Sequence, residues 1–139
     1  MNSARIIGAL VLGAGLFGPT TACGTDCKAL SVPDSVVVTV PIKLAKPPVE
    51  ICIDSRCYAG DGSGPSDYDK PLLNGVVLSL RLSGTLPTHS VELKVSIGSL
   101  SDTVSTIPIV SHLRGEGCGA SRSITLRFDT NGKLVPPIQ

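Results

Sequence analysis

The stretch VVLSLRL, residues 76–82, decides the fold class because apolar and polar side chains alternate along it. One face carries four aliphatic residues, Val76, Leu78, Leu80 and Leu82, and the other face carries Val77, Ser79 and Arg81. Side chains of a β-strand point alternately to opposite faces, whereas a helix repeats its apolar positions every three or four residues. The stretch therefore predicts a half-buried strand of an antiparallel sheet.

The same alternation recurs further along the chain. VELKVSI, residues 91–97, places Val91, Leu93, Val95 and Ile97 on one face, and residues 124–128 place Ile124, Leu126 and Phe128 on one face. Asn131 and Gly132 follow, and this dipeptide is the commonest signal of a short hairpin, here leading into Leu134 and Val135. These segments extend the predicted sheet structure to the end of the chain.

Proline marks the limits of two more predicted strands. Residues 36–42 are rich in β-branched side chains, with Pro33 before them and Pro41 near their end, while residues 104–110 contain Pro108. Proline is tolerated in sheets at edges and strand ends. We therefore expect the first strand to be an edge or to end at its prolines, and the second to be an edge strand.

About seven short strands in a single domain of this length predict an all-β fold, an antiparallel β-sandwich. The architecture resembles the immunoglobulin and fibronectin type III sandwiches, although the chain contains no tryptophan. Val, Leu and Ile must therefore supply the core. A small aliphatic core gives modest stability, so cross-links would be useful to this domain.

The N-terminus has the layout of a secretory signal peptide. Arg5 is followed by IIGALVLGAGLF, residues 6–17, which has no polar side chain, and then by small residues. The apolar part is shorter than the roughly 20 residues that a membrane span needs. We expect residues 1–22 to be removed and residues 23–139 to form the mature domain.

The residues around Cys23 resemble the lipobox of bacterial lipoproteins. Thr20, Thr21 and Ala22 precede this cysteine, and Ala22 fits the family pattern best, whereas Thr20 stands where leucine or valine is usual. The resemblance implies that Cys23 becomes lipidated and N-terminal, which would anchor the protein to the membrane. Two acyl chains give a stable attachment, since each buried methylene contributes about 0.8 kcal/mol. Ordinary signal cleavage near Ala22 is the alternative.

The other four cysteines predict two disulfides in an oxidising compartment. The segment VEICIDSRCYA, residues 49–59, reads as a hairpin with its turn at Asp54 and Ser55, which sets Cys52 opposite Cys57. Cys27 then pairs with Cys118 by elimination. A zinc site using Cys52, Cys57, Cys118 and His112 is disfavoured, because its ligands lack the compact spacing of structural zinc sites.

The loop AGDGSGPSDYDKP, residues 59–71, is the first place to look for a binding surface. Long loops on rigid scaffolds often carry recognition, and tyrosine is enriched at interfaces. Its candidate binding residues are Tyr58, Asp61, Asp67, Tyr68 and Asp69. The three aspartates could also hold a cation, but no glutamate closes the loop as in an EF-hand, so no metal is expected.

No catalytic constellation is evident. Neither His89 nor His112 has a carboxylate partner nearby in sequence. GEGCGA, residues 115–120, matches a dinucleotide-binding pattern, but the following segment reads as a strand where that pattern needs a helix. We therefore expect no cofactor and no enzymatic activity.

The charge balance gives no reason to expect nucleic-acid binding. Loss of residues 1–22 removes one of the twelve basic residues, Arg5, and leaves eleven basic and eleven acidic residues. Binding to a phosphate backbone depends on clustered Lys and Arg, and here the basic residues are scattered among acids.

The whole chain resembles the small single-domain lipoproteins of high-GC Gram-positive bacteria and their phages. The resemblance implies a non-enzymatic envelope module at the outer face of the cell membrane, which binds an envelope protein, a glycan or a phage factor. Two alternatives stay open: a small secreted hydrolase using His89 or His112, and a freely secreted interaction domain without lipid.

Overall fold

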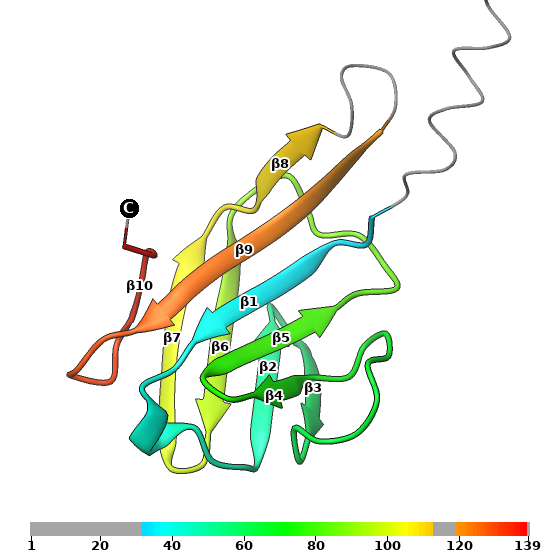
Figure 1. Cartoon of the computed structure of the whole chain (residues 1–139). Coiled ribbons are helices and arrows are strands. Elements are labelled where there is room, and N and C mark those ends of the chain that lie inside the picture. Colours follow the sequence, from blue (N-terminus) through cyan, green and yellow to red (C-terminus); the bar gives the residue numbers. More distant parts are fainter. Residues whose placement is uncertain (1–31, 113–118, 139) are drawn as a thin grey trace, which may run out of the picture. The chain divides into compact units, whose positions relative to one another are not determined.

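Figure 1 shows the computed structural model of the chain, which describes residues 32–112 and 119–138. Pro33–Ser111 and Ser121–Gln139 form one compact unit, and the four other described residues, Val32, His112, Gly119 and Ala120, belong to a second. The described residues form ten strands in two sheets, one short 3-10 turn, η2 (Ile42–Leu44), and no α-helix. The fold is an all-β sandwich, so the predicted fold class is confirmed.

The four-stranded sheet is entirely antiparallel. Its strands, in spatial order, are β3 (Arg56–Gly60), β2 (Val49–Ile53), β6 (Val91–Ile97) and β7 (Leu100–Thr106). Two-residue turns join β2 to β3 and β6 to β7. Asp54 and Gly98 begin these turns at φ values of 55° and 59°, the left-handed backbone that tight hairpins require. The predicted hairpin with its turn at Asp54 and Ser55 is confirmed.

The six-stranded sheet contains the strand with which the fold begins. Its spatial order is β10 (Leu134–Val135), β9 (Ala120–Phe128), β1 (Ser35–Thr39), β5 (Val77–Arg81) and β4 (Leu72–Asn74), and β8 (Ile109–His112) also pairs with β9. β1 is antiparallel to β5 and parallel to β9. The sandwich is therefore mostly antiparallel, and β1–β9 is a parallel pair. Alternation could not reveal this pair, because it is the same in both strand directions.

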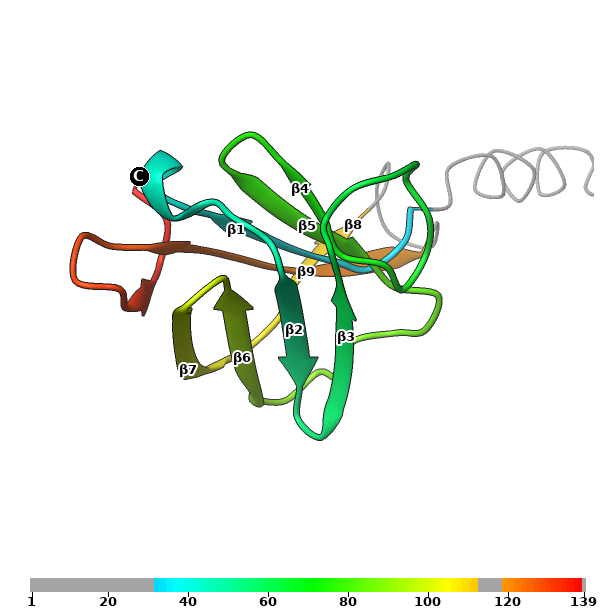
Figure 2. The ribbon, with the colours of Figure 1, turned by 90° about the horizontal axis from the view of Figure 1, so that it is seen from below.

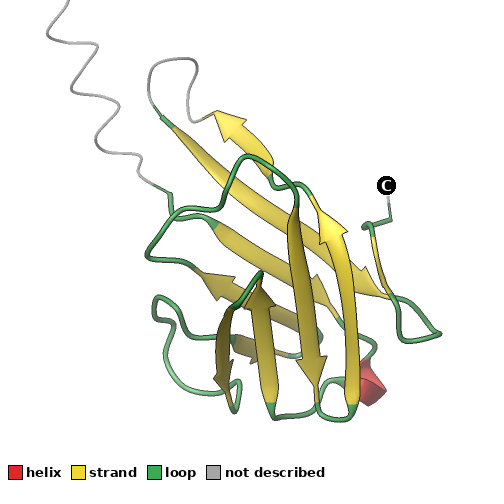
Figure 3. Ribbon diagram, turned by 180° about the vertical axis from the view of Figure 1, so that it is seen from behind, coloured by secondary structure: helices red, strands yellow, loops and turns green. Residues whose placement is uncertain are grey.

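The two sheets lie as two layers when viewed from below, with β3, β2, β6 and β7 in one and β1, β4, β5 and β9 in the other (Figure 2). From behind, the strands of the four-stranded sheet cross those of the other sheet (Figure 3). The core between them is aliphatic apart from Phe128, and its fully buried side chains include Val36, Val38, Ile51, Leu78, Leu80, Leu93, Val95 and Ile124. The faces predicted from alternation in residues 76–82, 91–97 and 124–128 are the buried ones.

The strand predicted over residues 104–110 is two strands in the structure. β7 ends at Thr106, before Pro108, and β8 begins at Ile109 in the other sheet. Proline has no backbone N–H to donate to a neighbouring strand, so Pro108 interrupts the sheet hydrogen bonds at the point where the chain crosses from one sheet to the other. β7 starts earlier than predicted because its first half, LSDT, has too few apolar residues to read as a half-buried strand.

β1 lies inside its sheet, and its flanking prolines mark strand ends, one of the two options that Pro33 and Pro41 predicted. β7 is the last strand of its sheet, as Pro108 had suggested. The C-terminal hairpin is present with Leu134 opposite Phe128, but its loop spans residues 129–133. Asp129 closes this loop by accepting the backbone N–H groups of Asn131 and Lys133.

Two inward-facing aspartates join segments that are distant in sequence. Asp34, only 5% exposed, accepts the N–H of Leu86 at 2.7 Å with Oδ2 and the N–H of Arg122 at 2.9 Å with Oδ1. Asp102 on β7 accepts the N–H of Leu134 at 2.8 Å, which links an edge of the four-stranded sheet to β10. Buried carboxylates need such partners, so each aspartate fixes the position of the segment that it binds.

Candidate binding pocket

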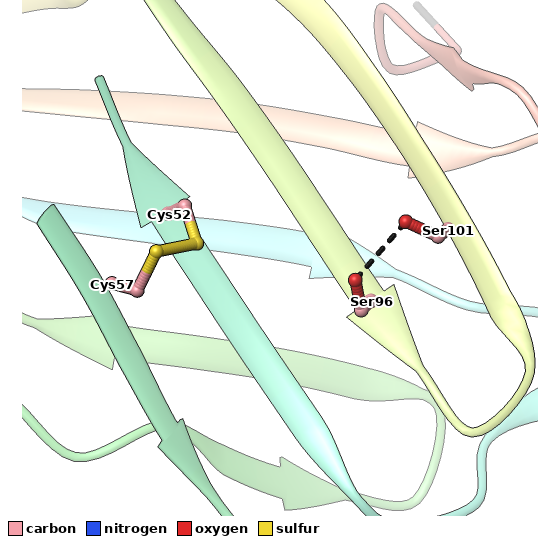
Figure 4. The surroundings of a disulfide bond; sticks show 4 residues. All are labelled: Cys52, Cys57, Ser96 and Ser101. Carbon is pink, nitrogen blue, oxygen red and sulfur yellow. Dashed lines mark hydrogen bonds between the residues drawn. A yellow bond between two sulfur atoms is a disulfide. The ribbon is translucent and has the colours of Figure 1, made fainter. Parts of the chain in front are cut away.

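The hairpin β2–β3 is fixed at both its strands and its turn. Cys52 and Cys57 form a disulfide across the hairpin, with their Cα atoms 3.9 Å apart (Figure 4), as the sequence predicted. At the turn, the N–H of Asp54 donates to the carbonyl of Glu92 at 2.8 Å, and Asp54 Oδ1 accepts the N–H of Glu92 at 2.9 Å. The turn is therefore held against the start of β6.

A pocket of about 230 Å³ lies between this hairpin and the segment that follows β5. The lining residues from the hairpin are Ile53, Asp54, Arg56 and Tyr58, and those from the following segment are Leu82, Gly84, Thr85, Leu86 and Pro87. Leu82 and Leu86 are buried, whereas Asp54, Arg56 and Thr85 are exposed. The pocket thus combines buried apolar side chains with exposed charged and polar ones, a combination common in ligand sites.

The predicted binding residues divide between this pocket and the neighbouring loop. Tyr58 lines the pocket and packs against the core. Tyr68 is 50% exposed, and the guanidinium carbon of Arg81 lies 5.0 Å from the centre of its ring. Asp69 bonds to Ser83, the residue immediately before pocket-lining Gly84. The loop is therefore attached beside the pocket.

Asp61 and Asp67 instead make local hydrogen bonds. Asp61 accepts the N–H of Ser63 at 3.0 Å, and Asp67 accepts the N–H of Tyr68 at 2.8 Å. Within residues 32–112 and 119–138, the carboxylates of the loop do not gather into a cation site. The one group of potential metal ligands found there is Glu50, Cys52 and Cys57, and both of its sulfurs are in the disulfide.

Asp69 is the carboxylate whose environment most directly concerns the pocket. Ser83 donates its hydroxyl to Asp69 Oδ2 at 2.5 Å and its N–H to Oδ1 at 3.0 Å. These two hydrogen bonds lower the pKa of Asp69 below its ordinary value, and the positive charge of Arg56 lowers it further. Arg56 therefore acts electrostatically on the loop and also lines the pocket.

Acid should weaken the attachment of the loop. Because the pKa of Asp69 is lower in the folded state, its contribution to stability is present above the unfolded-state pKa of about 3.9 and is lost as pH falls through the folded value. Asp69→Asn should reduce stability at neutral pH, and its difference from the parent should shrink below about pH 4. Asn tolerates the φ of 60° found at this position, so backbone strain does not explain the lower stability of Asp69→Asn.

Denaturant unfolding at several pH values measures this difference. Ser83→Ala, which removes the hydroxyl donor, should show the same convergence with the parent in acid. A stability gap for Asp69→Asn that stays constant from neutral pH to pH ~2 contradicts the assignment of the lowered pKa.

The remaining predicted site residues are not all described. His89 is exposed, with Nδ1 3.0 Å from the carbonyl of Ser90. His112 is the last residue of β8, but its side chain is outside what the structure describes. Cys23, Cys27 and Cys118 also fall outside the described residues, so the lipid site and the second disulfide stay predictions.

Arg56 is the pocket residue that sequence reasoning could have found. It lies two positions before Tyr58 on the same strand, so alternation places both side chains on one face. The residues from Leu82 to Pro87 gave no such signal, because only the packing of one sheet against the other brings them to the hairpin.

No protein-family model, curated protein or solved structure matches the chain. Among the described residues, no helix has the length and apolar character needed to cross a membrane.

Proposed function

We propose that the chain is a non-enzymatic binding module of the cell envelope, attached to the outer face of the membrane through a lipid on Cys23. Its pocket takes a group that projects from an envelope protein or glycan. The apolar segment before Cys23 and the Cys52–Cys57 disulfide support an exported, oxidising location. The ten residues between Cys23 and Asp34 could extend to about 34 Å, so the domain would remain near the bilayer.

The observation that carries this proposal is that separate interactions fix each wall of the pocket. The disulfide and the Asp54–Glu92 hydrogen bonds hold the hairpin. Asp34 binds the N–H of Leu86, and Asp69 binds Ser83, so the opposite wall is held at two points. A preformed pocket loses little conformational freedom on binding, which favours recognition of a partner.

The lining residues indicate the chemistry of the bound group. Leu82, Leu86 and Tyr58 suit a short apolar body, and Arg56 at the exposed side suits an anionic or hydrogen-bond-accepting end. A pocket of about 230 Å³ is small for a drug-sized ligand. One side chain or one sugar unit of a larger partner fits this volume better.

Site-specific photo-cross-linking in intact cells tests the pocket. A photoreactive residue at exposed Thr85 should capture one discrete envelope component, and the same residue at exposed Thr125, on β9, should not. Arg56→Glu should abolish the capture, while Lys94→Glu, an equal charge change on β6, should leave it intact. Equal capture from both positions, or capture that survives Arg56→Glu, overturns the assignment of the pocket.

Membrane fractionation tests the anchor separately. Cys23→Ala should release the exported chain from the membrane fraction, because the modified sulfur is lost. Intact-mass spectrometry of the parent should show the added diacylglyceryl group. A Cys23→Ala protein that stays as firmly bound as the parent rules out the lipid anchor but leaves the pocket untouched.

A further inference from the structure

The Cys52–Cys57 disulfide lies on the outer face of the four-stranded sheet. Val49 and Ile51 of β2 belong to the core, and side chains alternate along a strand, so Cys52 points to the opposite face. Figure 4 shows both sulfurs on that face, with strands of the other sheet passing behind. Since β3 is the last strand of its sheet, the disulfide links an edge strand to its neighbour and is not enclosed by the sandwich.

The two sulfurs differ in accessibility. Cys57 is exposed, whereas Cys52 is only 6% exposed. In thiol–disulfide exchange a thiolate attacks one sulfur, and the other sulfur leaves as a thiolate. The attacking sulfur approaches along the line of the breaking bond, which for Cys57 means from the side of the edge strand and for Cys52 from the side of β6. Exposure and direction of approach therefore both select Cys57 as the attacked sulfur.

The leaving sulfur, that of Cys52, has a positively charged neighbour. Lys94 lies directly opposite Cys52 in the register of β2 and β6, so the two side chains are neighbours on the outer face. The Lys94 side chain is exposed on this face. A nearby positive charge stabilises a thiolate, so Lys94 favours the departure of the Cys52 sulfur.

Glu50 brings a negative charge to the same site. A carboxylate oxygen of Glu50 and the two sulfurs of the disulfide all lie within 4.8 Å of one another. An attacking thiolate is negatively charged, so the Glu50 carboxylate repels it. A positive charge carried beside the attacking sulfur is attracted instead. The site therefore favours a thiol with a neighbouring cationic group over a thiol with a neighbouring carboxylate.

Cleavage of the disulfide leaves the backbone of the hairpin paired. The residues that flank its two-residue turn, Ile53 and Arg56, form a hydrogen-bonded pair, so the next pair, Cys52 and Cys57, is a non-hydrogen-bonded one. The hydrogen bonds between the turn and the start of β6 do not involve sulfur either. The sulfurs can therefore exchange partners while the strands keep their register.

We propose that the Cys52–Cys57 disulfide is a thiol-exchange site, at which an exported thiol with a neighbouring positive charge becomes attached to Cys57. The thiolate of that molecule forms a new S–S bond with Cys57 as the bond to Cys52 breaks, and the electron pair of the broken bond leaves on the Cys52 sulfur. Attack by Cys52 on the new bond reverses the attachment. The side chain of Cys57 points to the opposite face of β3 from those of Arg56 and Tyr58, so the site is separate from the pocket and is tested apart from the proposed function.

The full parent chain is treated with cysteamine, which carries an amine, or with mercaptoacetate, which carries a carboxylate, at equal thiolate concentration. Acid-quenched samples are alkylated and analysed by peptide mass spectrometry. The first adduct should be on Cys57, with a free thiol on Cys52, and cysteamine should react about tenfold faster. Glu50→Gln should bring the two rates close together, whereas Asp67→Asn, an equal charge change in the loop, should leave their ratio unchanged.

Uncharged mercaptoethanol tests Lys94. Lys94→Gln should slow its reaction with the disulfide, because the leaving thiolate loses a neighbouring positive charge. A rate unchanged by Lys94→Gln contradicts the role of this residue in the exchange.

Single-thiol variants measure the difference between the two sulfurs directly. With cystamine, the disulfide of cysteamine, the Cys57 thiol of Cys52→Ala should be modified roughly tenfold faster than the Cys52 thiol of Cys57→Ala. Circular dichroism establishes that each variant is folded, and the experiment on the parent chain does not depend on them. A parent disulfide that reacts with neither thiol, a first adduct on Cys52, or cysteamine reacting no faster than mercaptoacetate overturns the proposal.

Discussion

Asp34→Ala should lower the free energy of unfolding by about 3 kcal/mol, since a buried donor left unsatisfied costs about 1–3 kcal/mol. The Asp34 carboxylate accepts the N–H groups of Leu86 and Arg122, and these lie 52 and 88 residues further along the chain. Alanine leaves both donors without an acceptor. Urea unfolding followed by circular dichroism measures the change, because the chain has no tryptophan for fluorescence.

Two comparisons separate the role of Asp34 from a general effect of losing charge. Asp34→Asn keeps the size of the side chain but has one acceptor oxygen, so it should recover at most part of the loss. Asp67→Ala removes a carboxylate that accepts only the neighbouring N–H of Tyr68, and it should change stability by less than about 0.5 kcal/mol. Equal losses in Asp34→Ala and Asp67→Ala would show that the long-range hydrogen bonds contribute nothing.

Leu93→Ala should have an effect of similar size, also about 3 kcal/mol. Leu93 is completely buried at the middle of β6, opposite Ile53 of β2 and Val104 of β7. Truncation loses the transfer free energy of the removed methyl groups and leaves a cavity that the packed core closes only in part. Chemical unfolding should show a lower midpoint with an unchanged dependence on denaturant.

The adjacent position provides the control for Leu93. Lys94 lies on the same strand with its side chain exposed on the opposite face. Lys94→Ala should change stability by less than about 0.5 kcal/mol. Similar losses from both substitutions would contradict the placement of the core on the Leu93 face.

The fold class could be predicted from the sequence because alternating stretches such as residues 91–97 carry the core on one face. Which strands pair with one another was much harder to predict from the sequence. Nothing local shows that β1 lies beside β9, since the two strands are brought together by the packing of the whole sheet. The predicted strand over residues 104–110 starts after the true start of β7, at Leu100. Asp102 faces inward to bind Leu134, so a position on the core side has the polar residue expected on the surface side.

Only the part of the candidate site that the β2–β3 hairpin forms could be predicted from the sequence. The turn at Asp54 and Ser55 fixed the register, and the register placed Cys52 opposite Cys57. The loop predicted as a binding surface lies beside the pocket, but Asp61 and Asp67 bond within the loop. The second wall, around Leu86, depends on Asp34, which no sequence pattern singled out.

The central place of β1 has a mechanical consequence. A force applied at the start of β1, beside Asp34, would act on a strand that is held on both sides. β1 is hydrogen-bonded along its length to β5 on one side and β9 on the other. A pull along its axis therefore loads two ladders in shear at once instead of peeling them open bond by bond.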